Sequence, residues 1–237
     1  MPRWYNGLMA SKEAKVLEEL PIFPLSTVLF PGAILPLHIF EERYKAMMRY
    51  AIENSGQFGV SYRDDANVGR ESQPEIGSVG CAAKIYAVMP LEEGKMNVLT
   101  TGLIRYRITG FRQVVPFLIA KIETFGDDTE DESDMTRLYT DTRELAQKFL
   151  EQVRSLSDSR NTPAMELPED AESFSLLVAS AVPLDDGTKQ ALLEITSTRG
   201  RLTRLRHYLI NTLSTYTERL RLHDLAKRNG HGKKMPE

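Results

Sequence analysis

The apolar residues of this chain follow two different periods, one in each half. From residue 20 to about 125, short runs of alternating apolar and polar residues are separated by glycine, proline and acidic clusters, which is typical of β-strands. Prolines at positions 21, 24, 31 and 36 confine the first strands to short pieces and sheet edges. The expected strands are a run that begins at residue 20, followed by 33–40, 57–62, 77–89, 96–115 and 117–125.

One helix interrupts this series. Phe30-Pro31-Gly32 predicts a turn between the first two strands, because proline presets its first corner and glycine tolerates a positive φ. After Glu41 the apolar spacing changes to i, i+3, i+4 and i+7, which predicts an amphipathic helix over 41–54. Several short strands around one helix predict a compact antiparallel barrel or sandwich.

The second half has the helical period of 3.6 residues. Its expected helices are 134–157, one that opens at Pro168, a short one at 187–194 and a last one at about 200–226. Asp185 is the expected N-cap of the short helix, and Thr198 that of the last. The predicted organisation is therefore a leader (1–19), a β-rich barrel-like subdomain (20–126), an acidic linker (127–134), a helical subdomain (135–226) and a disordered tail (227–237).

Composition places the chain among ordinary soluble proteins. Its 237 residues are 41% hydrophobic and 27% charged, with a formal net charge of −3 that favours neither nucleic acid nor an anionic membrane. No apolar run approaches the roughly 20 residues that span a bilayer. The single cysteine, Cys81, excludes an internal disulfide and fits a reducing compartment, so we expect a cytoplasmic protein.

Five stretches of the sequence carry a resemblance to a known family. PIFPL, VLFPG and LPLHIFEERY, followed by a helix, resemble the opening of the Lon N-terminal domain, the substrate-binding domain of the ATP-dependent protease Lon. The TGLIRYRI strand and the KQALLEITSTRGRLTRLRHYL segment resemble later parts of that domain, so the likeness covers about residues 20–225. It implies an α+β fold in which a small PUA-like antiparallel β-barrel precedes an α-helical bundle. It also implies binding of unfolded or tagged proteins.

No catalytic constellation stands out. The sequence holds no G-x-x-x-x-G-K-[ST] phosphate loop, no G-x-S-x-G and no zinc-ligand spacing. Cys81 lies in a predicted strand, where a cysteine usually packs as a small hydrophobe, and His38 is more simply read as a histidine bonded to a backbone carbonyl near Glu41. We therefore expect a non-catalytic chain without cofactor or metal.

Arginines and lysines of the β-rich half could form a cationic face. Strand parity places Arg105 and Arg107 on one face of the strand 96–115, and Arg112 with Lys84 and Lys121 could extend this cationic face. Because PUA-like barrels include RNA-binding relatives, RNA binding is an alternative function, although an ordinary solvated face is favoured by the negative net charge.

The leading hypothesis is a protein-recognition module, which acts as an adaptor, a chaperone-like binder or an assembly factor. Its partner would be an unfolded or specific client protein, bound by strand addition or by docking of apolar side chains. A peptidase-associated subunit that acts with a separate ATPase and protease is a further alternative. The candidate binding residues, drawn from apolar turns and from the family-like LPLHIFEERY stretch, are Phe30, Pro31, Phe40, Arg43, Tyr44, Tyr86, Met89 and Pro90.

Overall fold

The structure is a computed structural model that describes residues 17–64, 73–131, 135–156 and 166–230. It separates into two compact units. The sheet unit contains the residues up to 127 together with 184–196, and the helix unit contains 128–183 and the residues from 197 onward. The predicted leader lies outside the described residues up to position 16, as do the last seven residues of the predicted tail.

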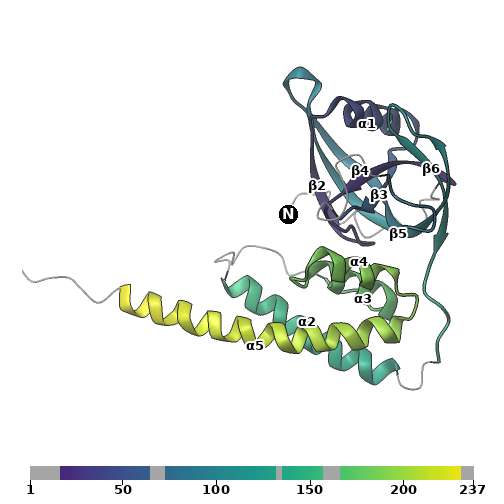
Figure 1. Cartoon of the computed structure of the whole chain (residues 1–237). Helices are drawn as coiled ribbons and strands as arrows, with labels where there is room; N and C mark the ends of the chain where they lie inside the picture. Colours follow the sequence, from purple (N-terminus) through teal and green to yellow (C-terminus); the bar gives the residue numbers. More distant parts are fainter. Residues whose placement is uncertain (1–16, 65–72, 132–134, 157–165, 231–237) are drawn as a thin grey trace, which may run out of the picture. The chain divides into compact units, whose positions relative to one another are not determined.

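In its described part, the sheet unit contains six strands, the helix α1, the short helix α4 and a single 3-10 turn, η2 (Glu92–Gly94) (Figure 1). In sheet order the strands are β2, β5, β4, β3, β1 and β6, and β6 pairs with β5 as well. Five strands therefore form a closed ring of pairings, and β2 lies outside it as an edge strand. The strand bounds are β1 Glu19–Leu25, β2 Ile34–Ile39, β3 Gln57–Tyr62, β4 Val79–Pro90, β5 Met96–Gln113 and β6 Leu118–Phe125.

One pairing corrects the expected all-antiparallel sheet. β1 and β3 run parallel, with Ile22 opposite Gly59, whereas the other pairs are antiparallel. Parallel neighbours need a crossover connection, and here β2 and α1 (Glu42–Asn54) supply it. The fold class is α+β, and its sheet is mixed.

The core of the sheet unit forms between α1 and the sheet. The apolar stripe predicted for this helix is buried as a whole and comprises Tyr44, Met47, Met48 and Ala51. These side chains pack against Phe23, Phe58 and Val98. A second cluster on the ring contains Leu20, Ile22, Tyr106 and Ile108.

The helix unit is built from α2 (Met135–Leu156), α3 (Ala171–Ala181) and α5 (Thr198–Gly230), with α5 packed against both of the others. Tyr139 meets Phe174 edge-on with ring centroids 5.1 Å apart, and Phe149 meets Tyr216 in the same way at 5.4 Å. The helix α5 begins two residues before the predicted start and extends four residues beyond the predicted end at 226. Its first turn is capped by Ser197 rather than by Thr198, since the Gly200 amide donates to Ser197 Oγ at 2.8 Å.

The short helix α4 (Asp186–Glu194) belongs to the sheet unit, although the sequence analysis placed it in the helical subdomain. Asp185 is its N-cap, as predicted, and accepts the Thr188 amide at 2.9 Å. The Gln190 side-chain amide donates to the Val79 carbonyl of β4 at 3.0 Å. Local helical period cannot show which unit a nine-residue helix packs against.

Candidate functional site

The candidate site is the outer face of the three strands that extend from the ring, namely β2, the start of β5 and the end of β4. Residues directly opposite each other on neighbouring strands share a face. One cross-strand row of this outer face is Met89, Asn97 and His38. The next row is Ala87, Leu99 and Pro36. The opposite face carries Val98 and turns toward the core.

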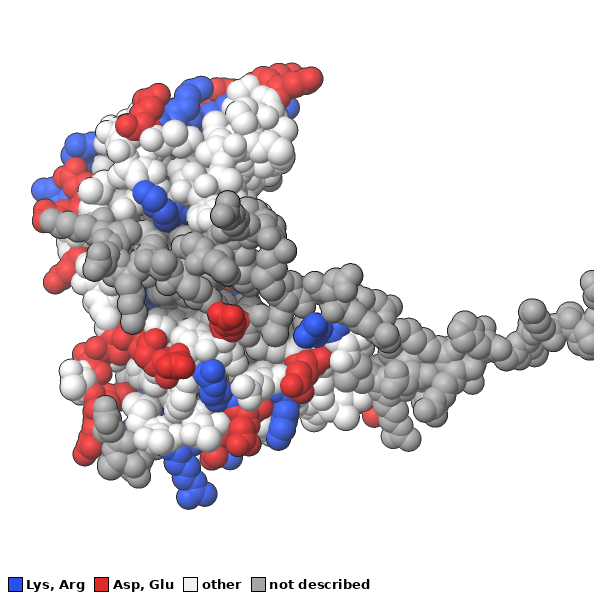
Figure 2. Space-filling view, turned by 180° about the vertical axis from the view of Figure 1, so that it is seen from behind, with Lys and Arg blue, Asp and Glu red and all other residues white. Residues whose placement is uncertain are grey.

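This outer face is apolar and exposed. Phe40 is 57% exposed, Met89 56% and Ile34 45%. Between the strands lies a shallow hollow of about 450 Å³ whose walls include Pro36, Met89 and Leu99. Figure 2 shows an uncharged area beneath the charged hairpin tip at the upper right of the sheet unit. A contiguous apolar surface of this kind is the usual mark of a binding site.

A polar pair lies within the apolar surface. His38 Nδ1 and Asn97 Oδ1 are joined by a hydrogen bond of 2.7 Å, and the His38 ring stacks on Phe40 with centroids 5.9 Å apart. The partner of His38 is thus a side chain across the strand pair and not the backbone carbonyl near Glu41 that the sequence analysis proposed. The bonded His38 ring thus lies against the exposed ring of Phe40.

Carboxylates collect at the end of the face where β2 finishes and the β4–β5 hairpin turns. Glu42 is 84% exposed at its side chain, whereas its partner Lys45 is only 6% exposed and donates to Glu42 at 2.7 Å and to the Glu93 carbonyl at 2.7 Å. Lys95 pairs with Glu93 at 2.6 Å. Because the carboxylates lie further out than the cations that pair with them, this end of the face presents negative charge to solvent.

The structure distributes the predicted binding residues unevenly. Phe40, Met89 and Pro90 lie on or beside the outer face and are exposed, as is Tyr86 in the irregular stretch of β4. Phe30 and Tyr44 are buried in the core, with 0% and 8% of their surface exposed. Pro31 is half-buried in the turn before β2, and Arg43 pairs with Glu41 at 3.1 Å while its guanidinium lies 4.5 Å from the ring centroid of Tyr44.

Sequence reasoning missed several residues of the face, namely Ile34, Pro36, Ala87 and Leu99. Each looks unremarkable in its own strand. The strands at 33–40 and 96–115 were predicted, but only the pairing of these two distant segments places their apolar residues side by side.

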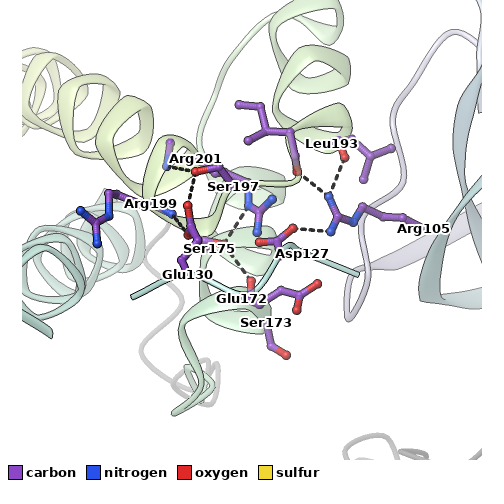
Figure 3. Close-up of polar contacts among 12 residues, drawn as sticks. Arg105, Asp127, Glu130, Glu172, Ser173, Ser175, Leu193, Ser197, Arg199 and Arg201 are labelled. Carbon is purple, nitrogen blue, oxygen red and sulfur yellow. Dashed lines mark hydrogen bonds and ion pairs between the residues drawn. The ribbon is translucent and has the colours of Figure 1, made fainter. Parts of the chain in front are cut away.

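The predicted cationic face loses its central member, Arg105, whereas Arg107 and Lys121 are exposed. Arg105 is 1% exposed and its guanidinium donates to the carbonyls of Leu193 (3.1 Å) and Ile195 (2.6 Å) at the end of α4 (Figure 3). It also forms an ion pair with the buried carboxylate of Asp127. Strand parity predicted an outward side chain, but α4 covers this part of β5. Arg112 forms an ion pair with Glu19 at 3.2 Å, and Arg107 donates a hydrogen bond to the Gly77 carbonyl.

The acidic segment is more than a solvated linker. Asp127 is its buried first residue. In the helix unit, Glu130 accepts the Ser197 hydroxyl at 2.6 Å and the Arg199 amide at 2.9 Å (Figure 3). A carboxylate at this position satisfies backbone donors at the N-terminus of α5 and complements its dipole.

The described residues contain no cluster of three or more metal-ligating side chains. Cys81 is fully buried, and burial raises the pKa of its thiol far above the ordinary range. A thiol that is neither accessible nor ionised cannot act as a nucleophile. Among the described helices, none is long and apolar enough to cross a membrane.

Comparison with known proteins decides the family. The model of the ATP-dependent protease La (LON) substrate-binding domain matches residues 19–211. The chain belongs to this family. Lon protease 2 of Herpetosiphon aurantiacus is 29% identical over 188 residues, which make up 79% of this chain and 23% of that protein. The Lon protease of Koribacter versatilis is 27% identical over 204 residues, or 86% of this chain and 25% of that protein. The chain thus spans about a quarter of the length of these Lon relatives.

Solved structures show the same fold. A Lon N-terminal domain protein from Xanthomonas campestris covers 80% of this chain and 97% of its own, with a TM-score of 0.57 and 23% identity. The N-terminal domain of the Mycobacterium avium complex Lon protease covers 81% and 97%, with a TM-score of 0.59 and 18% identity. The family supports a substrate-binding module of the Lon type, and these structures show that the fold is that of Lon N-terminal domains.

Proposed function

We propose that this Lon-type domain recognises polypeptides without catalysing a reaction, and that the outer face of β2, β5 and β4 is its binding surface. One observation carries the proposal: large apolar side chains are exposed side by side around a hollow on a sheet face, with Phe40 and Met89 the most exposed among them. Burial of one such side chain contributes about 1.5–3 kcal/mol, so two or three together contribute about 3–9 kcal/mol to the binding of a client, before the entropy cost of association is subtracted.

Unfolded segments are the ligand class that this surface fits. An unfolded chain exposes apolar side chains that a folded protein buries, and a shallow apolar hollow discriminates little among their shapes. We place the module in a cytoplasmic setting as an adaptor or chaperone-like binder that selects clients for a proteolytic system. The family membership supports this choice, because the relatives that contain a similar domain are Lon proteases.

The test uses a client that cannot fold. Fluorescence anisotropy of labelled, reduced and carboxymethylated lactalbumin is expected to report binding to the full chain. Met89→Asp should weaken this binding about tenfold or more, since a charge replaces a buried methionine in the complex. The matched control is Val115→Asp, on the turn between β5 and β6, where the valine is 80% exposed. Equal effects of the two substitutions would contradict the proposed surface.

The same structure gives less support to RNA binding than to polypeptide binding. The arginine that was central to the predicted cationic face is Arg105, and it is buried in an ion pair. An RNA-binding protein would lose affinity steeply between low and moderate salt. The apolar face predicts that client binding persists over that range.

A further inference from the structure

Among the described residues, β2 pairs with β5 alone, and its other edge carries outward-pointing backbone groups at every second residue. The Gly102 amide donates to the Ala33 carbonyl at 2.9 Å, directly before the first registered pair, Ile34 with Thr101. In an antiparallel pair, residues that exchange bonds with the neighbour alternate with residues whose N–H and C=O point away. Ile34, Pro36 and His38 therefore direct their backbone groups away from β5, the strand with which β2 pairs in the sheet.

Proline occupies the central outward position. Pro36 has no amide hydrogen, and at this place its absence costs β2 no bond to β5. The edge keeps the outward amides of Ile34 and His38 and the carbonyls of all three residues. A strand that pairs along the whole outward edge of β2 would find no backbone donor at Pro36. The proline therefore protects the edge against indiscriminate pairing, while it still permits a short segment to bind.

The side chains beside this edge set the composition of such a segment. A strand added next to β2 continues the pleat, and every second side chain lies on the outer face with Pro36 and His38. There the neighbours are the rings of His38 and Phe40, followed by Leu99 and Met89 across the sheet. Apolar residues are favoured at these alternate positions.

The charges at the two ends of the outer face determine where the ligand would carry its basic residues. The end of the face at Glu42 and Glu93 presents carboxylates that are 84% and 75% exposed at their side chains. The opposite end carries Lys84, which donates to the Ser55 carbonyl at 2.7 Å. A ligand with lysine or arginine near Glu42 and Glu93 complements this field.

Building on the proposed polypeptide recognition, we infer that the ligand is a short extended segment that adds as a strand to β2. It spans about five residues, the length from Ile34 to His38. It places apolar side chains at alternate positions on the outer face and carries basic residues at the hairpin end.

The test uses two labelled peptides, acetyl-Thr-Val-Thr-Val-Thr-Lys-Lys-amide and its reversal, because a strand can add in either direction. One of them should bind the full chain better than the other. In that peptide, methylation of either the valine or the threonine amides should weaken binding at least about tenfold, and methylation of the other set should be tolerated. This asymmetry follows because only alternate amides of an added strand face β2. Replacement of the lysines by glutamate should weaken binding about threefold, less at high salt.

Variants of the protein supply the reciprocal test. Ile34→Pro removes an outward amide and no bond to β5, so it should weaken peptide binding about three- to tenfold relative to Ile34→Ala, which removes the side chain alone. Circular dichroism should show that both variants remain folded.

Several outcomes would overturn strand addition. If methylation of both sets is tolerated, or both abolish binding equally, the ligand does not pair with β2. If Met89→Asp still weakens binding of unfolded lactalbumin, polypeptide recognition stands without strand addition. If neither peptide nor lactalbumin binds, both proposals fail. A concentration-dependent dimer in sedimentation that Ile34→Pro abolishes would assign the edge to a second copy of the chain.

Discussion

Tyr106 fills space that two glycines leave open inside the ring of strands. Its hydroxyl donates to the Val60 carbonyl at 3.2 Å and is bonded to the Ser61 hydroxyl at 2.9 Å. A Cβ added at Gly59 would lie 2.6 Å from the Tyr106 hydroxyl oxygen. Burial raises the pKa of this phenol far above its ordinary value, so the hydroxyl remains a donor. Gly59 of β3 and Gly80 of β4 thus both lie against the Tyr106 ring, and Ile22 and the Val60 carbonyl add to the crowding at these positions.

The first prediction tests this packing. Gly80→Ala should destabilise the protein by about 1–3 kcal/mol, because the new Cβ would lie 2.5 Å from Tyr106 Cζ and would also clash with the Val60 carbonyl. The measurement is urea denaturation followed by fluorescence. Gly110→Ala is the matched control, since no heavy atom lies within 4 Å of the Cβ it would add. Similar losses in both variants would show that the ring of Tyr106 is not the cause.

A second residue-scale prediction concerns the single cysteine. Cys81 is fully buried and the pKa of its thiol is raised by that burial, so little thiolate exists at pH 8. An aromatic disulfide reagent should modify the folded protein at least about 100-fold more slowly than the urea-unfolded protein. A cysteine placed at exposed Thr109 in a Cys81→Ala background should react at the unfolded rate. Fast modification of the folded wild-type chain would contradict the core assignment.

At the scale of elements, α4 provides a pH-dependent test. Asp185 accepts the Thr188 hydroxyl at 2.7 Å and its amide at 2.9 Å, and these bonds lower the pKa of the Asp185 carboxyl. The folded pKa lies below the unfolded value of about 3.9, so the cap contributes its full stability above that pH. The contribution is lost as the pH falls through the lowered folded pKa. Asp185→Ala should therefore destabilise the protein most near neutral pH and progressively less below about pH 4.

Urea denaturation of the wild type and of Asp185→Ala between pH 7 and pH 3 measures this effect. Thr188→Val keeps the amide donor and removes the hydroxyl, so the pH dependence of its stability should be smaller than that of the wild type. A difference between wild type and Asp185→Ala that stays constant with pH would argue against the ionised cap.

Most elements could be predicted because each has its own local period. The α1 stripe at Tyr44, Met47 and Met48 and the strand at 57–62 agree with the structure. The parallel pairing of β1 with β3 could not be predicted, because it depends on the path of β2 and α1 between them. The burial of Arg105 depends likewise on α4, more than 80 residues away in the chain. The candidate face was found only in part for the same reason: exposed Phe40 was expected, whereas Leu99 joins it through strand pairing.

At the scale of the whole molecule, the sheet unit is discontinuous in sequence. Its first segment ends at residue 127, and residues 184–196 return to it. Leu192 and Leu193 of α4 are buried, and the carbonyls of Leu193 and Ile195 accept the guanidinium of Arg105. A linear division of the chain into a β half and a helical half therefore omits part of the core of the sheet unit.

The last prediction follows from this discontinuity. A fragment of residues 17–127 should be markedly less stable than the same fragment joined to 184–196 by a flexible glycine-serine linker. Without α4, two leucine contacts worth about 1.5–3 kcal/mol each are lost, and Arg105 keeps a charge whose carbonyl acceptors are missing. Urea denaturation and amide dispersion in NMR spectra would compare the two fragments. In the joined fragment, Leu192→Asp with Leu193→Asp should abolish the gain, because charged side chains cannot take up those buried positions. If the fragment without α4 were equally stable, the contacts of Arg105 with this helix would contribute nothing to the fold.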